Sequence, residues 1–188
     1  MIETGFRERI DVSEMSRQNK PEISEEASKK FDALWGDDKV DESDNVEDNI
    51  ERVLQDYFTD LREKSECPET IPDNPFKESD LEKRSPEKNA EMREEFEEKR
   101  VQLKLEWQEA TGRTWPKYEH DVYSDNNKLI RKAGSDYDAH HIQPLGMGGK
   151  NEVSNITPLN AEVHYDKQGV HAQDSPYSKL DQILGGMD

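Results

Sequence analysis

The stretch of sequence that decides the fold of the last third of the chain reads DAHHIQPLGMGGKN, residues 138–151. It continues as NITPLN over residues 155–160, and His164 follows. We expect four elements here: a strand from Tyr137 to Ile142, a glycine-rich loop, a strand from Asn155 to Leu159, and a helix from Ala161 to Gln168. Asn160 would cap that helix and Gly169 would end it.

The histidines of this stretch suit two steps of a hydrolytic reaction. A neutral imidazole, with an ordinary pKa of ~6.5, is a competent base at physiological pH and a common ligand of Zn²⁺ and similar ions. Hydrolysing a phosphodiester requires a base that deprotonates water and a cation that neutralises the charge developing on the phosphoryl oxygens. Histidine can supply the base and help to hold the cation.

These residues resemble the HNH, or His-Me finger, nucleases. The similarity covers residues 137–171: His-His-Ile, then Pro144 and Gly148-Gly149, then Asn155 14 positions after His141, and His164 9 positions after that. The resemblance implies an α+β fold with a ββα-metal core, preceded by an acidic, mainly helical region. It also implies an endonuclease.

The resemblance assigns a role to each matching residue. His141 would be the general base, and Asn155 would either orient its imidazole or fix the strand pair. His140 and His164 would bind one divalent metal ion, Zn²⁺, Mg²⁺, Mn²⁺ or Ni²⁺. The glycines would let the loop turn tightly and lie close to the substrate backbone.

This sequence departs from the family pattern at one metal position. Colicin-like members carry a further metal-binding His four positions after the helix His, where this chain has Gln168. His171 is the nearest substitute and would complete the metal shell if the chain folds back; water is the alternative. Asp138 is a candidate third ligand because strand alternation places it beside His140. The same alternation turns His140 and His141 to opposite faces, so we expect a twisted or bulged strand.

Four cationic residues near the motif are candidates for binding phosphates of nucleic acid. They are Lys128, Arg131, Lys132 and Lys150. Scattered lysines are also common on plain protein surface, and that alternative remains open. His120 is expected to be structural.

Composition divides the chain into two regions. The 188 residues are 30% hydrophobic and 37% charged, with a net charge of −18. Through residue 110 there are 33 acidic against 18 basic residues, and after it 11 against 8. We expect an acidic helical region with a proline-containing linker over residues 1–84, and the nuclease domain with a leading helix over residues 85–188. The acidic region could bind a basic partner, occlude the site as a mimic of DNA, or act as a solvated spacer.

Apolar spacing predicts the helices in front of the motif. They span residues 24–35, 46–61 and 86–110, the second opened by Ser43 or Asn45 and the third capped by Ser85 and ended by Gly112. Residues 65–85 contain three prolines and predict a linker. Asp125-Asn126-Asn127, between Val122-Tyr123-Ser124 and residues 128–131, predicts a small hairpin.

Residues 111–188 further resemble the HNH toxin domains at the carboxyl ends of bacterial polymorphic toxins, of the contact-dependent inhibition and Rhs kinds. The residues that carry this similarity are residues 115–118, residues 123–134, residues 169–172 and residues 175–177. It implies a domain delivered from a larger secreted toxin into the target-cell cytoplasm, acting on DNA, with RNA not excluded, and neutralised by a cognate immunity protein.

The cysteine content and the absence of long apolar stretches limit these expectations further. Cys67 is the single cysteine, so an intrachain disulfide is excluded, and a reducing compartment fits. We expect no signal peptide and no membrane segment in this chain. Two alternatives stay open: a phage or housekeeping HNH endonuclease, and a non-catalytic interaction module stabilised by zinc bound to His140, His164, His171 and Asp138.

Overall fold

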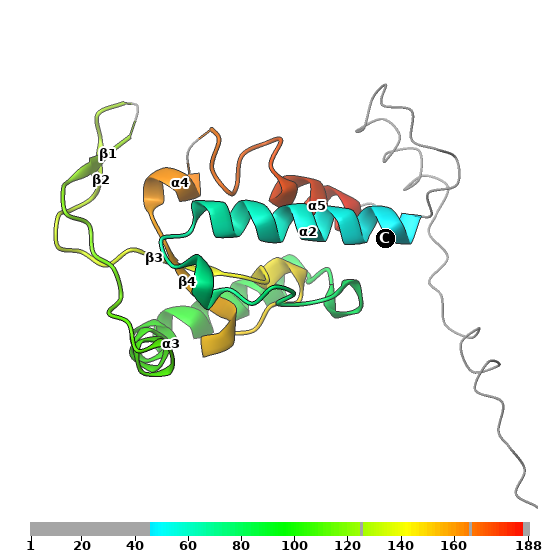
Figure 1. The fold of residues 1–188 in the computed structure, drawn as a ribbon, viewed down its shortest axis with the longest axis horizontal. Helices are drawn as coiled ribbons and strands as arrows, with labels where there is room; N and C mark the ends of the chain where they lie inside the picture. The colour runs from blue at the N-terminus through cyan, green and yellow to red at the C-terminus, as the bar shows by residue number, and fades with distance from the viewer. Residues whose placement is uncertain (1–45, 125, 166, 186–188) are drawn as a thin grey trace, which may run out of the picture.

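The computed structural model describes residues 46–124, 126–165 and 167–185. Its helices are α2 (Val46–Lys64), α3 (Pro86–Thr111), α4 (Ala161–Tyr165) and α5 (Pro176–Gly185); its strands are β1 (Val122–Tyr123), β2 (Leu129–Arg131), β3 (Asp138–His141) and β4 (Ile156–Leu159). Long helices and small antiparallel sheets make this an α+β fold, as expected (Figure 1). The predicted helix at 24–35 lies outside the described residues.

Helix α2 forms because its apolar residues recur on one face, as the sequence predicted. Ile50, Val53, Tyr57 and Leu61 are at most 1% exposed, and that face lies in the main hydrophobic core. Helix α5 packs against α2 in this core through Leu180 and Leu184 (Figure 1).

Helix α5 was not predicted, although the sequence carries a signal for it. Pro176 is its first residue, and Ser175 accepts a hydrogen bond from the Ser178 amide (3.2 Å). A serine followed by proline at the first helical position is a start signal, and it is the same one that opens α3.

Helix α3 confirms both of its predicted ends. The Ser85 side chain accepts a hydrogen bond from the Lys88 amide, and Gly112 ends the helix in the left-handed conformation, with φ of 68°. Phe96, Leu103 and Trp107 face a second core cluster that includes Trp115 and Ile156. α3 therefore covers one face of the β3–β4 pair.

The two sheets each contain two antiparallel strands. Strands β1 and β2 form the predicted hairpin, in which Asn127 has φ of 57°. Strands β3 and β4 pair in regular register, with His140 opposite Thr157 and His141 opposite Ile156. Of the expected twist or bulge in β3, the bulge was wrong, because the register of this pair contains none.

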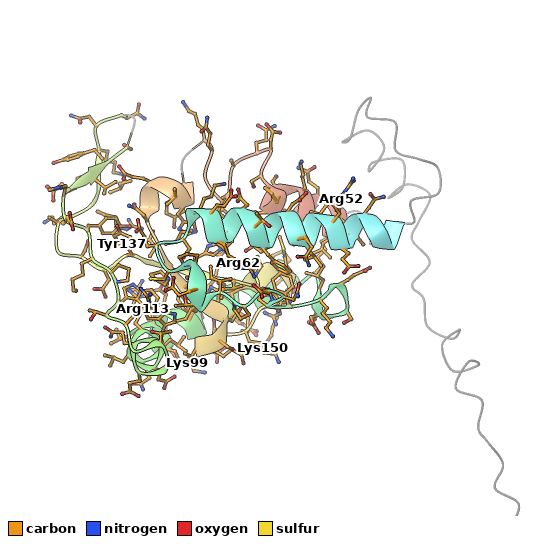
Figure 2. All side chains as sticks on the ribbon, in the orientation of Figure 1. Arg52, Arg62, Lys99, Arg113, Tyr137 and Lys150 are labelled. Atoms are coloured by element: carbon orange, nitrogen blue, oxygen red, sulfur yellow. The ribbon has the colours of Figure 1, made fainter. Side chains whose placement is uncertain are left out.

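The segment between α2 and α3 is more ordered than a linker. It holds only short 3-10 turns, yet Cys67, Ile71 and Phe76 are buried. Arg62 of α2, labelled in Figure 2, donates hydrogen bonds to the carbonyls of Ile71 (3.5 Å) and Pro72. Ile71 and Phe76 belong to the same core cluster as Ile142 and Met147, so this cluster contains residues from both sides of the predicted boundary between residues 84 and 85.

Three elements near the motif are shorter than predicted. Strand β3 spans Asp138–His141 rather than residues 137–142. Helix α4 ends at Tyr165 rather than Gln168, and β4 begins at Ile156, because Asn155 closes a 3-10 turn. Asn160 does cap α4, since its side chain accepts a hydrogen bond from the Glu162 amide (3.0 Å). No helix in the described part of the chain is long and apolar enough to span a membrane.

Candidate metal centre

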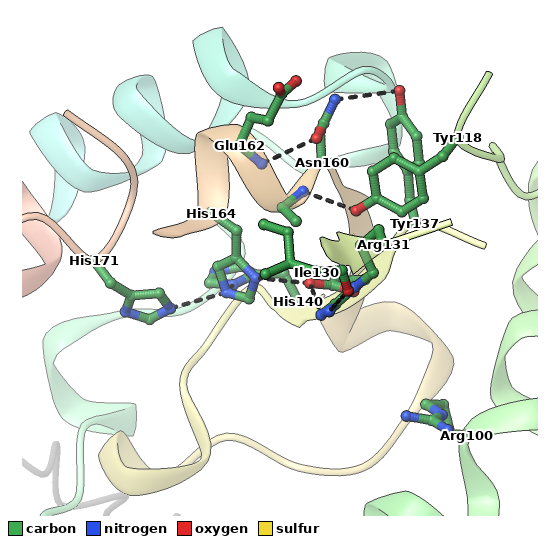
Figure 3. Close-up of polar contacts among 12 residues, drawn as sticks. Arg100, Tyr118, Ile130, Arg131, Tyr137, His140, Asn160, Glu162, His164 and His171 are labelled. Atoms are coloured by element: carbon green, nitrogen blue, oxygen red, sulfur yellow. Dashed lines mark hydrogen bonds and ion pairs between the residues drawn. The ribbon is translucent and has the colours of Figure 1, made fainter. Parts of the chain in front are cut away.

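Three histidines from separate elements converge at one point (Figure 3). His140 lies on β3, His164 on α4, and His171 in the turn that follows α4. His164 Nε2 lies 3.1 Å from His140 Nδ1 and 3.0 Å from His171 Nε2. One nitrogen from each ring lies within 4.8 Å of the other two.

His171 reaches this cluster because the chain folds back after α4. The Val170 amide donates to the Val163 carbonyl (3.0 Å), which turns the chain toward His164. The His171 ring also packs edge-on against Tyr177 of α5, with centroids 4.2 Å apart. Gln168, at the family's metal position, is exposed, and the exposed His120 lies outside the cluster.

The nitrogen positions fit a metal ion. A tetrahedral zinc ion with Zn–N bonds of about 2.0–2.1 Å holds two ligand nitrogens about 3.3 Å apart, close to the two observed separations. Burial lowers the pKa of His171 to about 4, and that of His140 falls well below its ordinary value because of burial and the neighbouring histidines. Both rings are therefore neutral at pH 7, as metal ligands must be.

The carboxylate of Asp138 lies next to His164, on the side of the ring nitrogen that does not face the other two histidines. Asp138 Oδ2 lies 3.6 Å from His164 Nδ1, which has no hydrogen-bond partner among the described residues. Arg131 donates to both carboxylate oxygens of Asp138, each at 2.8 Å. Although burial raises it, the pKa of Asp138 is lowered overall by its interactions with His164 and Arg131. Asp138 is therefore held by Arg131 and stays outside the group of converging nitrogens.

Tyr57 of α2 contacts the cluster from the other side of His140. Its hydroxyl donates to the Ile142 carbonyl (2.8 Å) and lies 3.4 Å from His140 Nε2. Burial raises the pKa of this phenol well above its ordinary value, so the hydroxyl stays protonated. Sequence analysis missed this residue.

His141 is on the opposite face of β3, toward α3. Its Nε2 lies 3.0 Å from Asn151 Oδ1, and its ring packs edge-on against Phe96, with centroids 4.5 Å apart. Asn151 Nδ2 in turn donates to the Met92 carbonyl (2.8 Å) and to Glu95 (3.1 Å). These donations leave the amide oxygen for His141, so His141 carries its proton on Nε2 and has a free lone pair on Nδ1.

The environment keeps His141 neutral. Burial lowers its pKa to about 4, although the hydrogen bond with Asn151 acts in the opposite direction. The ring is therefore neutral at pH 7.

Asn155 contacts the main chain rather than His141. Its Oδ1 accepts from the Gln143 amide (2.7 Å), and its Nδ2 donates to the carbonyls of Gln143 (3.0 Å) and Lys150 (2.9 Å). Of the two predicted roles, these contacts match fixing the strand pair. Asn151 has the contact to His141 that the sequence suggested for Asn155.

The glycine-rich loop is packed against the protein. A Cβ at Gly148, whose φ is 96°, would lie 2.8 Å from the Asp80 carbonyl, and a Cβ at Gly149 would collide with the Gln143 carbonyl. Arg84 donates to the carbonyls of Leu145 and Gly148, each at 2.9 Å. Gly148 and Gly149 are therefore required for close contacts within the chain.

The His cluster and His141 line one cleft of about 1000 Å³ between α3 and the free edge of β3. His140 and His141 lie on opposite faces of β3, and both line the cleft because it follows the free edge of this strand. Five cations line it: Arg93, Arg100, Lys104, Lys117 and Arg131. Only Arg131 was among the predicted phosphate contacts, whereas Lys128, Lys132 and Lys150, the last labelled in Figure 2, are exposed residues away from the cleft lining.

Most of these cations already have a carboxylate partner. Arg100 pairs with Glu97 (3.0 Å), and Lys104 and Lys117 pair with Asp136 (3.3 and 2.6 Å). Among the described residues Arg93 has no ion pair, and its charge contributes to lowering the pKa of His141 and His171. Arg93 is therefore a cation of the cleft lining whose charge acts on both histidines.

Comparison with known proteins gives one relevant similarity. The chain is 31% identical over 134 residues to the protein named Toxin YxiD from Bacillus subtilis (strain 168). The match covers 68% of this chain but 23% of that protein, so this chain spans about a quarter of its relative. No family model matches the chain.

Proposed function

We propose that the chain is a metal-dependent endonuclease that hydrolyses phosphodiester bonds of DNA. The observation that carries the proposal is the convergence of three histidine nitrogens in the cleft that also contains His141. In this proposal β3, β4 and α4 form a ββα-metal core of the HNH type.

The three converging histidines, His140, His164 and His171, would hold one divalent ion. The ion would neutralise charge that develops on the phosphoryl and leaving oxygens during cleavage. An all-nitrogen donor set favours Zn²⁺ or Ni²⁺ over Mg²⁺, which prefers oxygen ligands. The distances from His164 Nε2 to the nitrogens of His140 and His171 support this assignment.

His141 would act as the general base. Its Nε2–H is engaged by Asn151, so Nδ1 is the atom that takes a proton from the attacking water. General-base catalysis by a positioned side chain contributes typically ~10²–10⁴-fold to the rate. Arg93 would bind a phosphate beside it, because a guanidinium without a carboxylate partner can donate two parallel hydrogen bonds to phosphate oxygens.

The contacts of Asp138 argue against a structural zinc site. Structural zinc is normally held by four protein ligands, whereas a catalytic site keeps one position open. Asp138, the expected fourth ligand, already accepts two hydrogen bonds from Arg131. Three histidines with an open position favour catalysis.

We further propose that this activity is that of a toxin delivered as part of a longer secreted protein and neutralised by a cognate immunity protein. The similarity to Toxin YxiD supports this setting over a phage or housekeeping endonuclease. Production of the chain inside bacteria should then stop growth, and His141→Ala should abolish the effect.

A plasmid-nicking assay with Zn²⁺, Ni²⁺, Mn²⁺ and Mg²⁺ tests the activity. The wild-type chain should nick DNA with at least one ion, and His141→Ala should lose cutting while it still binds the metal. His120→Ala is the matched control, because His120 is exposed and outside the cluster. Unchanged cutting by His141→Ala would refute the mechanism, and a labelled RNA in parallel would reveal a different substrate.

A further inference from the structure

The contact between the Tyr57 hydroxyl and His140 Nε2 determines which ring nitrogen of His140 carries the proton. Tyr57 is fully buried and His140 is 4% exposed, so water has little access to either group. The two residues are 83 positions apart and lie on different elements, α2 and β3. Their contact is therefore a product of the fold rather than of the local motif.

Counting hydrogens fixes the direction of each bond. The phenol has one hydrogen, which it donates to the Ile142 carbonyl at 2.8 Å. Its oxygen can then only accept from His140 Nε2, which lies 3.4 Å away. A neutral imidazole protonated at Nε2 has its lone pair on Nδ1. That is the atom that faces His164 Nε2 at 3.1 Å.

We propose that Tyr57 is a positioning residue for the metal centre: it holds His140 in the Nε2–H tautomer and orients Nδ1 toward the ion. This inference rests on the metal site of the proposed function and adds a requirement to it. Ligating histidines generally donate their second ring N–H to an acceptor that fixes the tautomer and the ring orientation. Here the acceptor comes from α2, so the centre depends on a helix outside the 85–188 domain that sequence analysis predicted.

Tyr57→Phe is the variant that tests the role, because it keeps the ring and removes the acceptor. Loss of such a partner typically weakens metal binding by ~10–100-fold. We expect the Kd for Zn²⁺, measured by competition with a chromophoric chelator on the full chain, to rise by that factor. Tyr118→Phe is the matched control, since it also loses a buried hydroxyl that contacts the main chain, at the Ala161 amide. Among the described residues Tyr118 has neither a hydrogen bond nor a ring contact with a cluster histidine.

A second measurement on the metal-free wild-type chain does not depend on the variant folding. Nitrogen-15 NMR of the imidazoles distinguishes the two neutral tautomers, and we expect His140 to carry its proton on Nε2. In Tyr57→Phe the signal should move toward a mixture of tautomers. A wild-type His140 protonated on Nδ1, or equal Zn²⁺ affinity for Tyr57→Phe and wild type, would overturn the inference.

The two proposals fail in different ways. A wild-type chain that binds none of the ions refutes the metal site of the proposed function. In that case the tautomer of His140 in the wild-type chain still decides whether Tyr57 orients the ring.

Discussion

Exchanging Asn155 and Asn151 separately for alanine should damage different properties of the protein. Asn155→Ala removes three hydrogen bonds to the main chain of Gln143 and Lys150. Each hydrogen bond contributes about 1 kcal/mol net, and a buried donor left without an acceptor costs about 1–3 kcal/mol more. Since Asn155 is buried, we expect the free energy of unfolding to fall by about 3–5 kcal/mol.

Asn151→Ala should instead affect cleavage. Asn151 is half-buried, so water can replace part of its hydrogen bonding, and we expect a stability loss of about 1 kcal/mol. Its amide oxygen, however, fixes the proton of His141 on Nε2. Without it the ring can rotate or change tautomer, and we expect a loss of at least about tenfold in cleavage rate, from the ~10²–10⁴-fold that a positioned base supplies.

Urea denaturation and plasmid nicking on the same protein preparations separate the two effects. Asn74→Ala is the control, because Asn74 is exposed and bonds only to Gln55 among the described residues; its stability should stay within about 0.5 kcal/mol of wild type. If Asn155→Ala were as stable as this control, the structural role of Asn155 would be wrong. Wild-type cleavage by Asn151→Ala would show that His141 needs no such partner.

Three further predictions concern the stability of the glycine-rich loop, the dependence of stability on pH, and stabilisation by Zn²⁺. Arg84→Gln should lower the free energy of unfolding by about 2 kcal/mol, measured in urea, because the loop carbonyls of Leu145, Gly148 and Gly149 lose a charged donor. Without metal, stability should be full above pH ~6.5 and fall toward pH 4, since the unfolded His141 takes up a proton there and the folded one, with a pKa of about 4, does not. His141 contributes at most about 1.4 kcal/mol per pH unit to this slope. His140, whose pKa burial also lowers, adds to the slope in the same direction, and the more exposed His171 adds a smaller share. Urea titrations at several pH values in the presence of a chelator measure it, and a flat profile would contradict it. Zn²⁺ at 100 times its Kd should stabilise the chain by about 2.7 kcal/mol, and His171→Ala at the same Zn²⁺ concentration should lose most of that gain in thermal denaturation.

Local signals in the sequence were enough to predict the elements that depend on local chemistry. Ser85, Pro86 and Gly112 bound α3 because caps act within one turn, and Asn127 adopts the left-handed conformation that its hairpin requires. The same kind of signal at Ser175 and Pro176 was present for α5. Helix periodicity likewise predicted which face of α2 is buried.

The contacts that complete the site could not be predicted in this way. Asn151 bonds to Glu95 across 56 positions, and Tyr57 contacts His140 across 83. No periodicity or cap relates such residues, because their approach depends on how α2 and α3 pack on the β3–β4 pair. The two possible roles of Asn155 came from its position in the motif. That position alone did not distinguish Asn155, which bonds to the main chain, from Asn151, which contacts His141.

The regular pairing of β3 gives two neighbouring histidines separate surroundings. Because side chains alternate along a strand, His140 faces α2 and α4, where Tyr57 and His164 contact it, while His141 faces α3, where Asn151 and Phe96 contact it. A bulge would have turned both rings to one side and made them share partners. The free edge of β3 lets both rings line one cleft while each keeps its own hydrogen-bond partner. His140, the proposed metal ligand, and His141, the proposed base, are therefore adjacent in the sequence, yet each has its own contacts and can be mutated without removing those of the other.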